Sequence, residues 1–136
     1  MSSSPEEFTR YRQKMNERIL SENNKVVRRF FSLDKQVYAE TEHLSSQTKE
    51  LLGLVASLVL RCDDCISYHV AQAKESGSSN EQIIEAMSVG LVVGGSIVIP
   101  HMRRAVGFLD QLDLDQQGEQ GQPAASGCAD HPAAKD

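Results

Sequence analysis

Apolar residues recur at helical spacing through most of this chain, and this periodicity constrains its fold more than any other feature. The strongest stretch lies between positions 47 and 60, where its length and the Lys49-Glu50 start favour a buried helix over a buried strand. The sequence has three Tyr, four Phe and no Trp, so its core must rest on Leu, Val, Ile and Ala. These residues favour packed helices, and we predict an all-α bundle of five to six helices.

Capping and stop signals set the expected limits of these helices. Ser4 with Glu7, and Ser79 with Gln82, have the spacing of capping boxes. Gly77 is a good C-terminal stop. The first predicted helix runs from Pro5 to an interruption at 23–24, and the pattern continues to about Glu40 with a break near Ser32. The next helix begins at Gln47, capped by Ser45 or Ser46, and another runs from about Cys62 to Gly77. The last two run from Ser79 to Gly94-Gly95 and from Ser96 to Leu112, where Pro100 could kink or delay the helix.

The expected domain occupies residues 1–112. A chain of 136 residues suits a single domain. The domain's core is expected over residues 44–112, and its N-terminal helices over residues 5–40. Residues 113–136 hold one large apolar side chain, Leu114, which is too little burial to offset the entropy of ordering them. We therefore predict a disordered C-terminal tail.

Charge and hydropathy argue against several classes of partner. A net charge of −5 disfavours nucleic acid, because phosphate binding needs a concentrated basic surface. The chain lacks a run of about 20 apolar residues, and its polar start does not resemble a secretory signal, so we expect a cytoplasmic protein with no membrane partner. The helices near 51–60 and 83–99 are apolar on most faces, which favours burial against other copies in a homo-oligomer.

Three chemically active side chains share one helical stripe. On a single helix, Cys62, Cys65 and His69 fall within a sector about 60° wide. The two cysteines are one turn apart, close enough for a disulfide, and a helix N-terminus and a neighbouring His both favour the nucleophilic thiolate. Asp63 and Asp64 oppose a thiolate by their charge, unless they point outward. The pattern predicts a redox-active cysteine pair in which the second thiol resolves the intermediate.

Two other interpretations of the motif stay open. Zinc could be bound by Cys62, Cys65 and His69, although the chain lacks a second closely spaced ligand pair. A thioredoxin-like domain would need a strand over residues 54–60. A c-type haem is excluded, because Ile66 and not a His follows the second cysteine. In the zinc interpretation, His43 or His101 would be the fourth ligand; otherwise His101 is expected to be structural. Tyr68 is expected to be a packing residue that faces away from His69, and Cys128 a free thiol in the tail.

The spacing Glu50-x11-Cys62-x2-Cys65-x3-His69 resembles the signature of the AhpD-like alkylhydroperoxidase family, within the carboxymuconolactone decarboxylase superfamily. The resemblance covers residues 44–112, about half of the chain. It departs from the best-known members at Asp64, where they carry a His, and in length, since they have an additional N-terminal helical portion.

The resemblance implies a helical fold that assembles into homo-oligomers, often trimers or hexamers. It also implies a redox-active Cys62–Cys65 disulfide, with no other cofactor and no metal. Cys65 would be the attacking thiolate, Cys62 the resolving thiol, His69 the base, and Glu50 the residue that orients it. The thiols would reduce a hydroperoxide or a peroxiredoxin's disulfide, and a dithiol such as lipoamide would reduce them again. Acid–base chemistry on a small lactone, with His69 as base, is an alternative that the superfamily name suggests.

Overall fold

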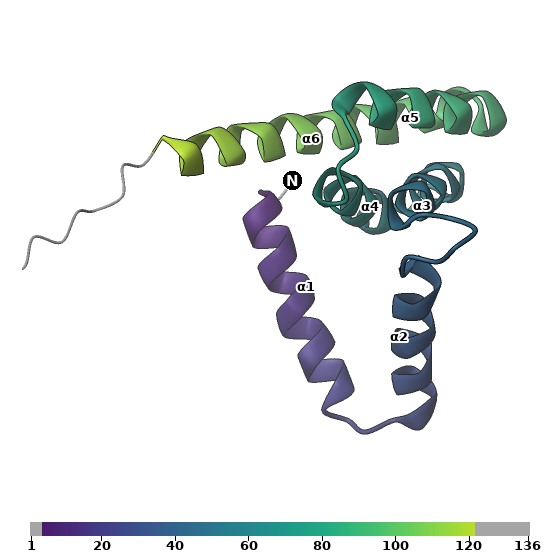
Figure 1. Cartoon of the computed structure of the whole chain (residues 1–136), viewed down its shortest axis with the longest axis vertical. Coiled ribbons are helices and arrows are strands. Elements are labelled where there is room, and N and C mark those ends of the chain that lie inside the picture. Colours follow the sequence, from purple (N-terminus) through teal and green to yellow (C-terminus); the bar gives the residue numbers. More distant parts are fainter. Residues whose placement is uncertain (1–3, 122–136) are drawn as a thin grey trace, which may run out of the picture.

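Six α-helices and one short 3-10 turn make up the computed structural model, which describes residues 4–121 (Figure 1). The predicted all-α architecture is confirmed. The thioredoxin-like alternative is wrong, because a helix and not a strand covers residues 54–60. The elements are α1 (Pro5–Leu20), α2 (Lys25–Tyr38), α3 (Ser46–Leu60), α4 (Asp63–Glu75), α5 (Asn80–Gly94), η1 (Ser96–Val98) and α6 (Ile99–Gln120).

Polar side chains cap most of the helix starts. Ser4 and Ser79 both form the predicted capping boxes, each with a reciprocal bond from the third helical residue. Ser45, one of the two expected candidates, accepts a hydrogen bond from the backbone N–H of Thr48 at 3.1 Å. At the last helix, η1 precedes Pro100, which lies in the first turn of α6, where a missing N–H costs nothing.

The second helix is more regular than expected. Its start follows the predicted interruption, since Asn24 caps α2 and accepts from two backbone N–H groups at 3.0 and 3.1 Å. The predicted break near Ser32 is wrong, because α2 passes through this residue without interruption. The Ser32 hydroxyl accepts a hydrogen bond from Gln36 one turn later at 3.2 Å, so it does not compete with the helix backbone.

The last helix continues beyond its expected end at Leu112 and stops at Gln120. Asp113, the first residue of the expected tail, accepts bonds from Lys74 of α4 at 2.9 Å and from Asn80 of α5 at 2.6 Å. These contacts hold the helix where its composition alone predicts none. The rest of the expected tail, with Cys128 and His131, lies outside the described residues.

The hydrophobic core lies among the four C-terminal helices. Helix α3 packs against α4 and α5, and α4 packs against α6 (Figure 1). Ten apolar side chains are fully buried there, all between positions 54 and 109: Leu54, Leu58, Ile66, Val70, Ala73, Ile83, Met87, Val98, Ala105 and Leu109.

The first two helices project from this body as the two arms of a V (Figure 1). Helix α1 is attached to α6 by the edge-to-face pair of Phe8 and Phe108, whose ring centroids are 5.5 Å apart. Helix α2 contacts α3 but has no buried residue of its own. The arms therefore enclose a space beside α4 instead of closing onto it.

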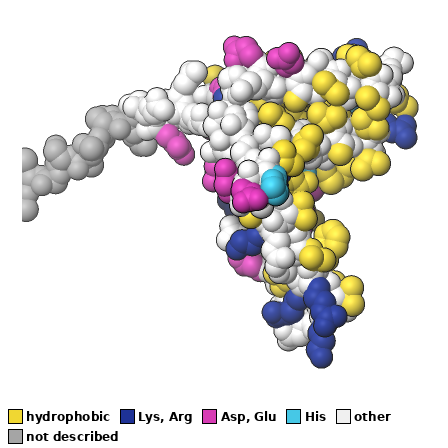
Figure 2. Space-filling view, turned by 45° about the vertical axis from the view of Figure 1, so that its right-hand side comes forward, with side chains coloured by type: hydrophobic (Ala, Val, Ile, Leu, Met, Phe, Trp, Pro, Cys, Tyr) yellow, Lys and Arg dark blue, Asp and Glu magenta, His cyan; other side chains and the backbone are white. Residues whose placement is uncertain are grey.

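A broad apolar surface covers part of the body and continues down one arm. Figure 2 shows hydrophobic side chains gathered there, with Lys and Arg at the tip of the arm. Among residues 4–121, no helix is both long and apolar enough to cross a membrane. Eleven of the exposed large apolar side chains belong to α2, α3, α5 and η1, and we call this set the apolar face: Val26, Phe30, Leu33, Val37, Leu52, Leu60, Ile84, Val89, Val92, Val93 and Ile97.

Candidate active site

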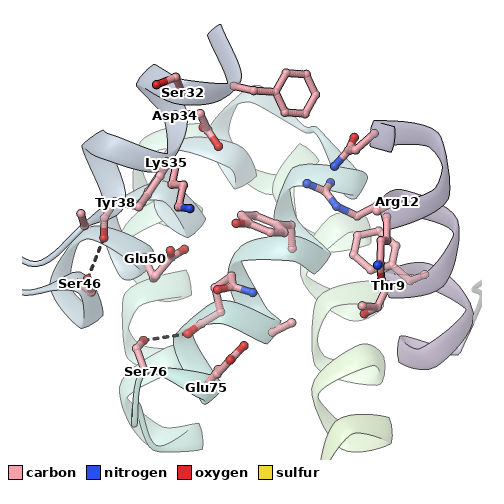
Figure 3. Close-up of a pocket in the computed structure, with 18 of the residues that line it drawn as sticks. Thr9, Arg12, Ser32, Asp34, Lys35, Tyr38, Ser46, Glu50, Glu75 and Ser76 are labelled. Atoms are coloured by element: carbon pink, nitrogen blue, oxygen red, sulfur yellow. Dashed lines mark hydrogen bonds between the residues drawn. The ribbon is translucent and has the colours of Figure 1, made fainter. Parts of the chain in front are cut away.

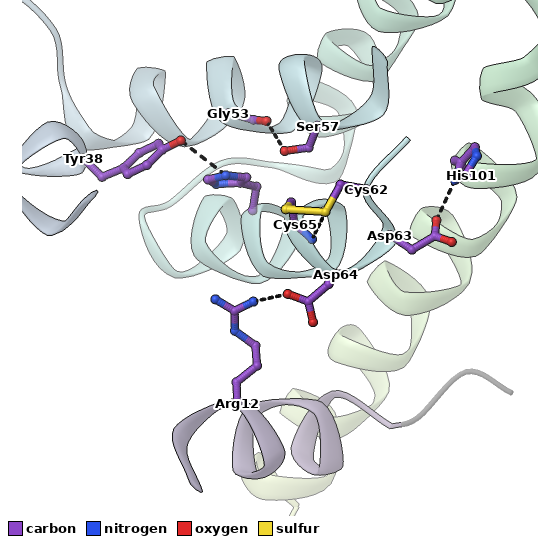
Figure 4. Close-up of a disulfide and its surroundings, with 10 residues drawn as sticks. Arg12, Tyr38, Gly53, Ser57, Cys62, Asp63, Asp64, Cys65 and His101 are labelled. Carbon is purple, nitrogen blue, oxygen red and sulfur yellow. Dashed lines mark hydrogen bonds and ion pairs between the residues drawn. A yellow bond between two sulfur atoms is a disulfide. The ribbon is translucent and has the colours of Figure 1, made fainter. Parts of the chain in front are cut away.

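The cysteine pair lies at the start of α4, directly after a sharp helix-to-helix turn. Arg61 ends α3 in the left-handed conformation, with φ 59°, and the Cys62 N–H donates to the Ser57 carbonyl at 3.1 Å. Cys62 then caps α4, and its sulfur accepts from the Cys65 backbone N–H at 3.4 Å. The two cysteines form a disulfide, with their Cα atoms 5.3 Å apart (Figure 4). Both sulfurs thus lie at the positive end of the helix dipole, which favours a thiolate after reduction.

His69 and Glu50 form a buried pair between α4 and α3. The His69 Nδ1 lies 2.7 Å from a Glu50 oxygen, and the two side chains are only 9% and 7% exposed. Because a carboxylate can only accept, Nδ1 must carry the proton in this bond. The neutral ring then has its lone pair on Nε2. This arrangement orients a general base.

Tyr38, at the end of α2, meets the other nitrogen of this ring. Its hydroxyl lies 3.3 Å from the His69 Nε2 (Figure 4). Burial, followed by the charges of Asp34 and Glu50, raises the pKa of Tyr38 above its ordinary value, so the hydroxyl keeps its proton. Sequence reasoning missed this residue, because no local spacing connects it to a histidine 31 positions later.

Gly53 makes room for the meeting of Tyr38 and His69. A Cβ on this glycine would lie 2.6 Å from the His69 Cε1 and 2.8 Å from both the Nε2 and the Tyr38 hydroxyl. Only a residue without a side chain allows the ring to lie this close to α3. A glycine inside a strongly helical pattern was the available signal, since such a residue costs helix stability and usually has a packing reason.

The structure therefore brings the four predicted site residues together as two linked pairs. Cys62 is bonded to Cys65, and Glu50 is bonded to His69, which lies one turn after Cys65 on α4. Among the described residues, the His69 ring makes its hydrogen bonds to Glu50 and Tyr38 and none to a sulfur. The catalytic roles of the four residues stay a prediction.

The two aspartates between the cysteines are paired with cations from distant helices. Asp63 contacts His101 at 2.7 Å and Arg104 at 3.1 Å, both from α6, and Asp64 pairs with Arg12 of α1. Burial acts to raise the pKa of Asp63, but the bonds to His101 and Arg104 outweigh it and hold that pKa below its ordinary value. Figure 4 shows both carboxylates directed away from the disulfide, toward the side chains that pair with them.

The histidines considered as a fourth zinc ligand have other partners. His101 is bonded to Asp63, and His43 lies 3.1 Å from Glu42 on an exposed loop. In the part of the chain that the structure describes, no three His, Cys, Asp or Glu side chains are grouped as metal ligands would be.

A cavity of about 1100 Å³ lies between the two arms and α4. Figure 3 shows Arg12 of α1 on one side of it and Tyr38 and Glu50 on the other. Tyr68 also lines this cavity, and its ring meets that of His69 edge-on with centroids 5.2 Å apart. The expectation that Tyr68 faces away from His69 is therefore wrong, because the two rings are in contact.

The part of the chain that holds the candidate site is also the part that matches known proteins. The model of the carboxymuconolactone decarboxylase family matches residues 24–107. Two crystal structures of TM1620 from Thermotoga maritima are 52% identical to this chain. One covers 82% of this chain and 97% of its own, with a TM-score of 0.79. The other covers 83% and 96%, with a TM-score of 0.77, and is described as a member of that family with a possible part in an antioxidative response.

Two further relatives are more distant. The uncharacterized protein 4 in the cox locus of Paracoccus denitrificans is 34% identical over 84 residues, which cover 62% of this chain and 75% of that protein. A family protein from Legionella pneumophila, apo-lpg0406, is 18% identical and has a TM-score of 0.71, with 79% of this chain and 95% of that chain covered. At this identity the similarity shows the shared fold alone.

Proposed function

Because the chain belongs to the carboxymuconolactone decarboxylase family, we propose that it is a thiol-dependent oxidoreductase that reduces a hydroperoxide, or the disulfide of a peroxiredoxin, with its Cys62–Cys65 pair. The observation that carries the proposal is the disulfide at the start of α4, one turn before the buried His69–Glu50 pair. The possible antioxidative part described for the similar Thermotoga protein supports it.

The proposed reaction begins with the reduced pair. His69 takes the proton of the Cys65 thiol on its Nε2, which gives up its bond to the Tyr38 hydroxyl, and the thiolate attacks the terminal oxygen of the hydroperoxide. The O–O bond breaks, Cys65 becomes a sulfenic acid, and His69 returns its proton to the departing alkoxide. The Cys62 thiol then attacks the sulfenic sulfur, which forms the disulfide and releases water. Two thiols and one hydroperoxide thus yield a disulfide, an alcohol and water.

A dithiol of the lipoamide type completes the cycle. One of its thiolates attacks the Cys62–Cys65 disulfide and forms a mixed disulfide, and its second thiol displaces the protein. The dithiol becomes a cyclic disulfide and both cysteines are reduced. The cavity between the arms and α4 is lined by Glu50 and Tyr38 but by neither cysteine.

Substitution of each cysteine tests the proposal. Cys65→Ser removes the nucleophile, so hydroperoxide reduction should fall to background. Cys62→Ser keeps the nucleophile but not the resolving thiol, so one oxidation should occur and the sulfenic acid should accumulate, which dimedone labelling and mass spectrometry can detect. Full hydroperoxide reduction by Cys65→Ser would overturn the assignment.

The Glu50–His69 pair is tested by a substitution that keeps its geometry. Glu50→Gln still accepts the Nδ1–H bond but no longer balances a charged imidazole. Turnover should fall about a hundredfold, in the range that general-base catalysis contributes. Glu75→Gln is the matched control, because Glu75 lines the same cavity but has no contact with His69.

The family name offers a second candidate, an acid–base reaction on a small lactone. The His69–Glu50 pair favours it, because this pair is complete without either sulfur. The double variant Cys62→Ala/Cys65→Ala separates the two functions. Retained turnover of a lactone by this variant would favour the second candidate, whereas the first requires that all hydroperoxide reduction is lost.

We also propose that several copies of the chain assemble into a homo-oligomer, a trimer or a hexamer. The apolar face supports this, because its eleven large apolar side chains lie exposed in the single chain. It includes residues of both segments whose apolar faces the sequence predicts to pack against other copies.

A further inference from the structure

Arg12 is a cation of the α1 arm that lies beside the Cys62–Cys65 motif. Its guanidinium pairs with Asp64, the residue directly before Cys65, although the two lie 52 positions apart in the sequence. The same guanidinium lies 4.3 Å from the centroid of the Tyr68 ring and 5.4 Å from that of Phe8. The side chain is 27% exposed, so these contacts hold it at one place between α1 and α4.

Charges approach the cysteine pair from every element packed around it. Helix α3 brings Glu50 and ends at Arg61, and α4 itself carries Asp63, Asp64 and His69. Helix α6 brings His101 and Arg104, which already balance Asp63, and the Glu50 carboxylate is bonded to His69. Within residues 4–121, Asp64 has a single cationic partner, and that partner is Arg12.

This balance matters because Asp64 adjoins the proposed nucleophile. A carboxylate near a thiol disfavours the thiolate, and a guanidinium paired with that carboxylate offsets this effect. Arg12 lies in α1, outside the residues 24–107 that the family model matches. The α1 arm thus supplies a charge that the matched part of the chain does not.

We propose that Arg12 is a positioning residue of the redox site, which neutralises Asp64 and so keeps Cys65 in its reactive thiolate form. The inference rests on the proposed function, in which Cys65 is the nucleophile. Arg12 touches neither sulfur and acts through Asp64 alone. The α1 arm, which looks like an appendage to the core, is therefore part of what activates the cysteine pair.

The test measures the reactivity of Cys65 in the reduced full-length protein. Its rate of alkylation by iodoacetamide is followed from pH 5 to 10, with the modified peptide identified by mass spectrometry. Arg12→Met should move the midpoint upward by about half to one pH unit, a modest shift for a partly exposed charge. That shift corresponds to about three- to tenfold less thiolate below the midpoint. Arg12→Lys, which keeps the charge, should restore most of the wild-type midpoint.

A double variant separates electrostatics from a loss of structure. Arg12→Met/Asp64→Asn also lacks the ion pair, so any detachment of α1 would persist in it. The proposal requires that its midpoint returns to the wild-type value or below, because the uncompensated charge is gone. Arg10→Met is the matched control: Arg10 lies on the same helix in an exposed pair with Glu6, and its loss should leave the midpoint unchanged.

Two results would overturn the proposal: an unchanged midpoint in Arg12→Met, or an upward shift that persists in the double variant. Alkylation needs no substrate, so its outcome is distinct from that of the proposed function. If the wild-type protein reduces no hydroperoxide but the midpoints shift as stated, the proposed function fails and the role of Arg12 in thiolate formation stands.

Discussion

At the scale of single residues, the site depends on a few side chains that lie far apart in the sequence. Cys62, Cys65 and His69 could be selected from the sequence because they recur at helical intervals, and Glu50 because its spacing from them resembles the family signature. Tyr38 and Arg12 could not, since their contacts with His69 and Asp64 arise only when the two arms fold beside α4. Spacing along the sequence thus predicts the four site residues but not the side chains that distant helices bring to them.

Gly53 offers a sharp test at this scale. In Gly53→Ala the added Cβ would overlap the His69 ring and the Tyr38 hydroxyl, so one or both must move. We expect a loss of about 1–3 kcal/mol in the free energy of unfolding, as for other overpacked sites. The hydroperoxide turnover that we propose should fall with it. Chemical denaturation and a turnover assay measure the two effects.

Gly107→Ala is the matched control, because a Cβ at Gly107 of α6 meets no atom within 4 Å. Alanine favours a helix over glycine, so this change should stabilise the protein by about 0.5–1 kcal/mol. A Gly53→Ala variant that gained stability to the same extent would contradict the close packing described around His69.

At the scale of helices, the sequence predicts starts better than ends. Capping residues lie next to the helices that they start, so the caps at Ser4, Ser45 and Ser79 could be predicted from adjacent positions. The end of α6 could not, because Asp113 is held by Lys74 and Asn80 from two other helices. Composition indicates how much apolar surface a segment can bury, but not whether a polar side chain in it has distant partners.

The Asp113 contacts predict a pH-dependent contribution to stability. Hydrogen bonds from Asn80 and then Lys74 lower the pKa of Asp113 in the folded protein. A carboxyl with a lowered folded pKa stabilises the fold above its unfolded pKa of about 3.9, and this stabilisation is lost as the pH falls through the folded value. Asp113→Asn should therefore unfold at a lower temperature than wild type near pH 7.

The gap between the two melting temperatures should narrow as the pH falls from about 4, the ordinary pKa of the unfolded carboxyl, through the lower pKa of the folded one. Because the Asp113–Lys74 ion pair is partly exposed, it should contribute about 1 kcal/mol or less to the free energy of unfolding. Asp110→Asn, a change on the same helix at an exposed residue, serves as control. A gap that stayed constant down to the lowest pH at which the protein folds would contradict this assignment.

At the scale of the whole molecule, the chain divides into a packed body and two projecting helices. Within residues 4–121, the body contains the ten fully buried side chains of the hydrophobic core, whereas α2 has no buried residue. The apolar periodicity of the sequence predicted helices in both parts. The periodicity could not distinguish the body from the projecting helices. An apolar helix face gives the same sequence pattern whether it packs in the core of its own chain or lies exposed, as Val92 does.

Assembly is the prediction that belongs to this scale. Light scattering on the full chain should give a mass that is a multiple of 15.0 kDa. Val92→Glu should lower that multiple without loss of helix content, since Val92 is 85% exposed in the single chain. Leu114→Glu, at an exposed site outside the apolar face, should leave it unchanged. A wild-type mass of one chain at micromolar concentration would contradict the proposed oligomer.

The central claim is that Cys62 and Cys65 reduce a hydroperoxide by cycling between a dithiol and a disulfide. The most direct measurement is a titration of the fully reduced protein with an alkyl hydroperoxide under anaerobic conditions. Mass spectrometry then follows the two cysteines, and chromatography follows the alcohol product. The account predicts one alcohol and one Cys62–Cys65 disulfide for each hydroperoxide consumed, until the dithiol is exhausted. Consumption of the hydroperoxide with both thiols left reduced, or an intact hydroperoxide beside the reduced pair, would contradict it.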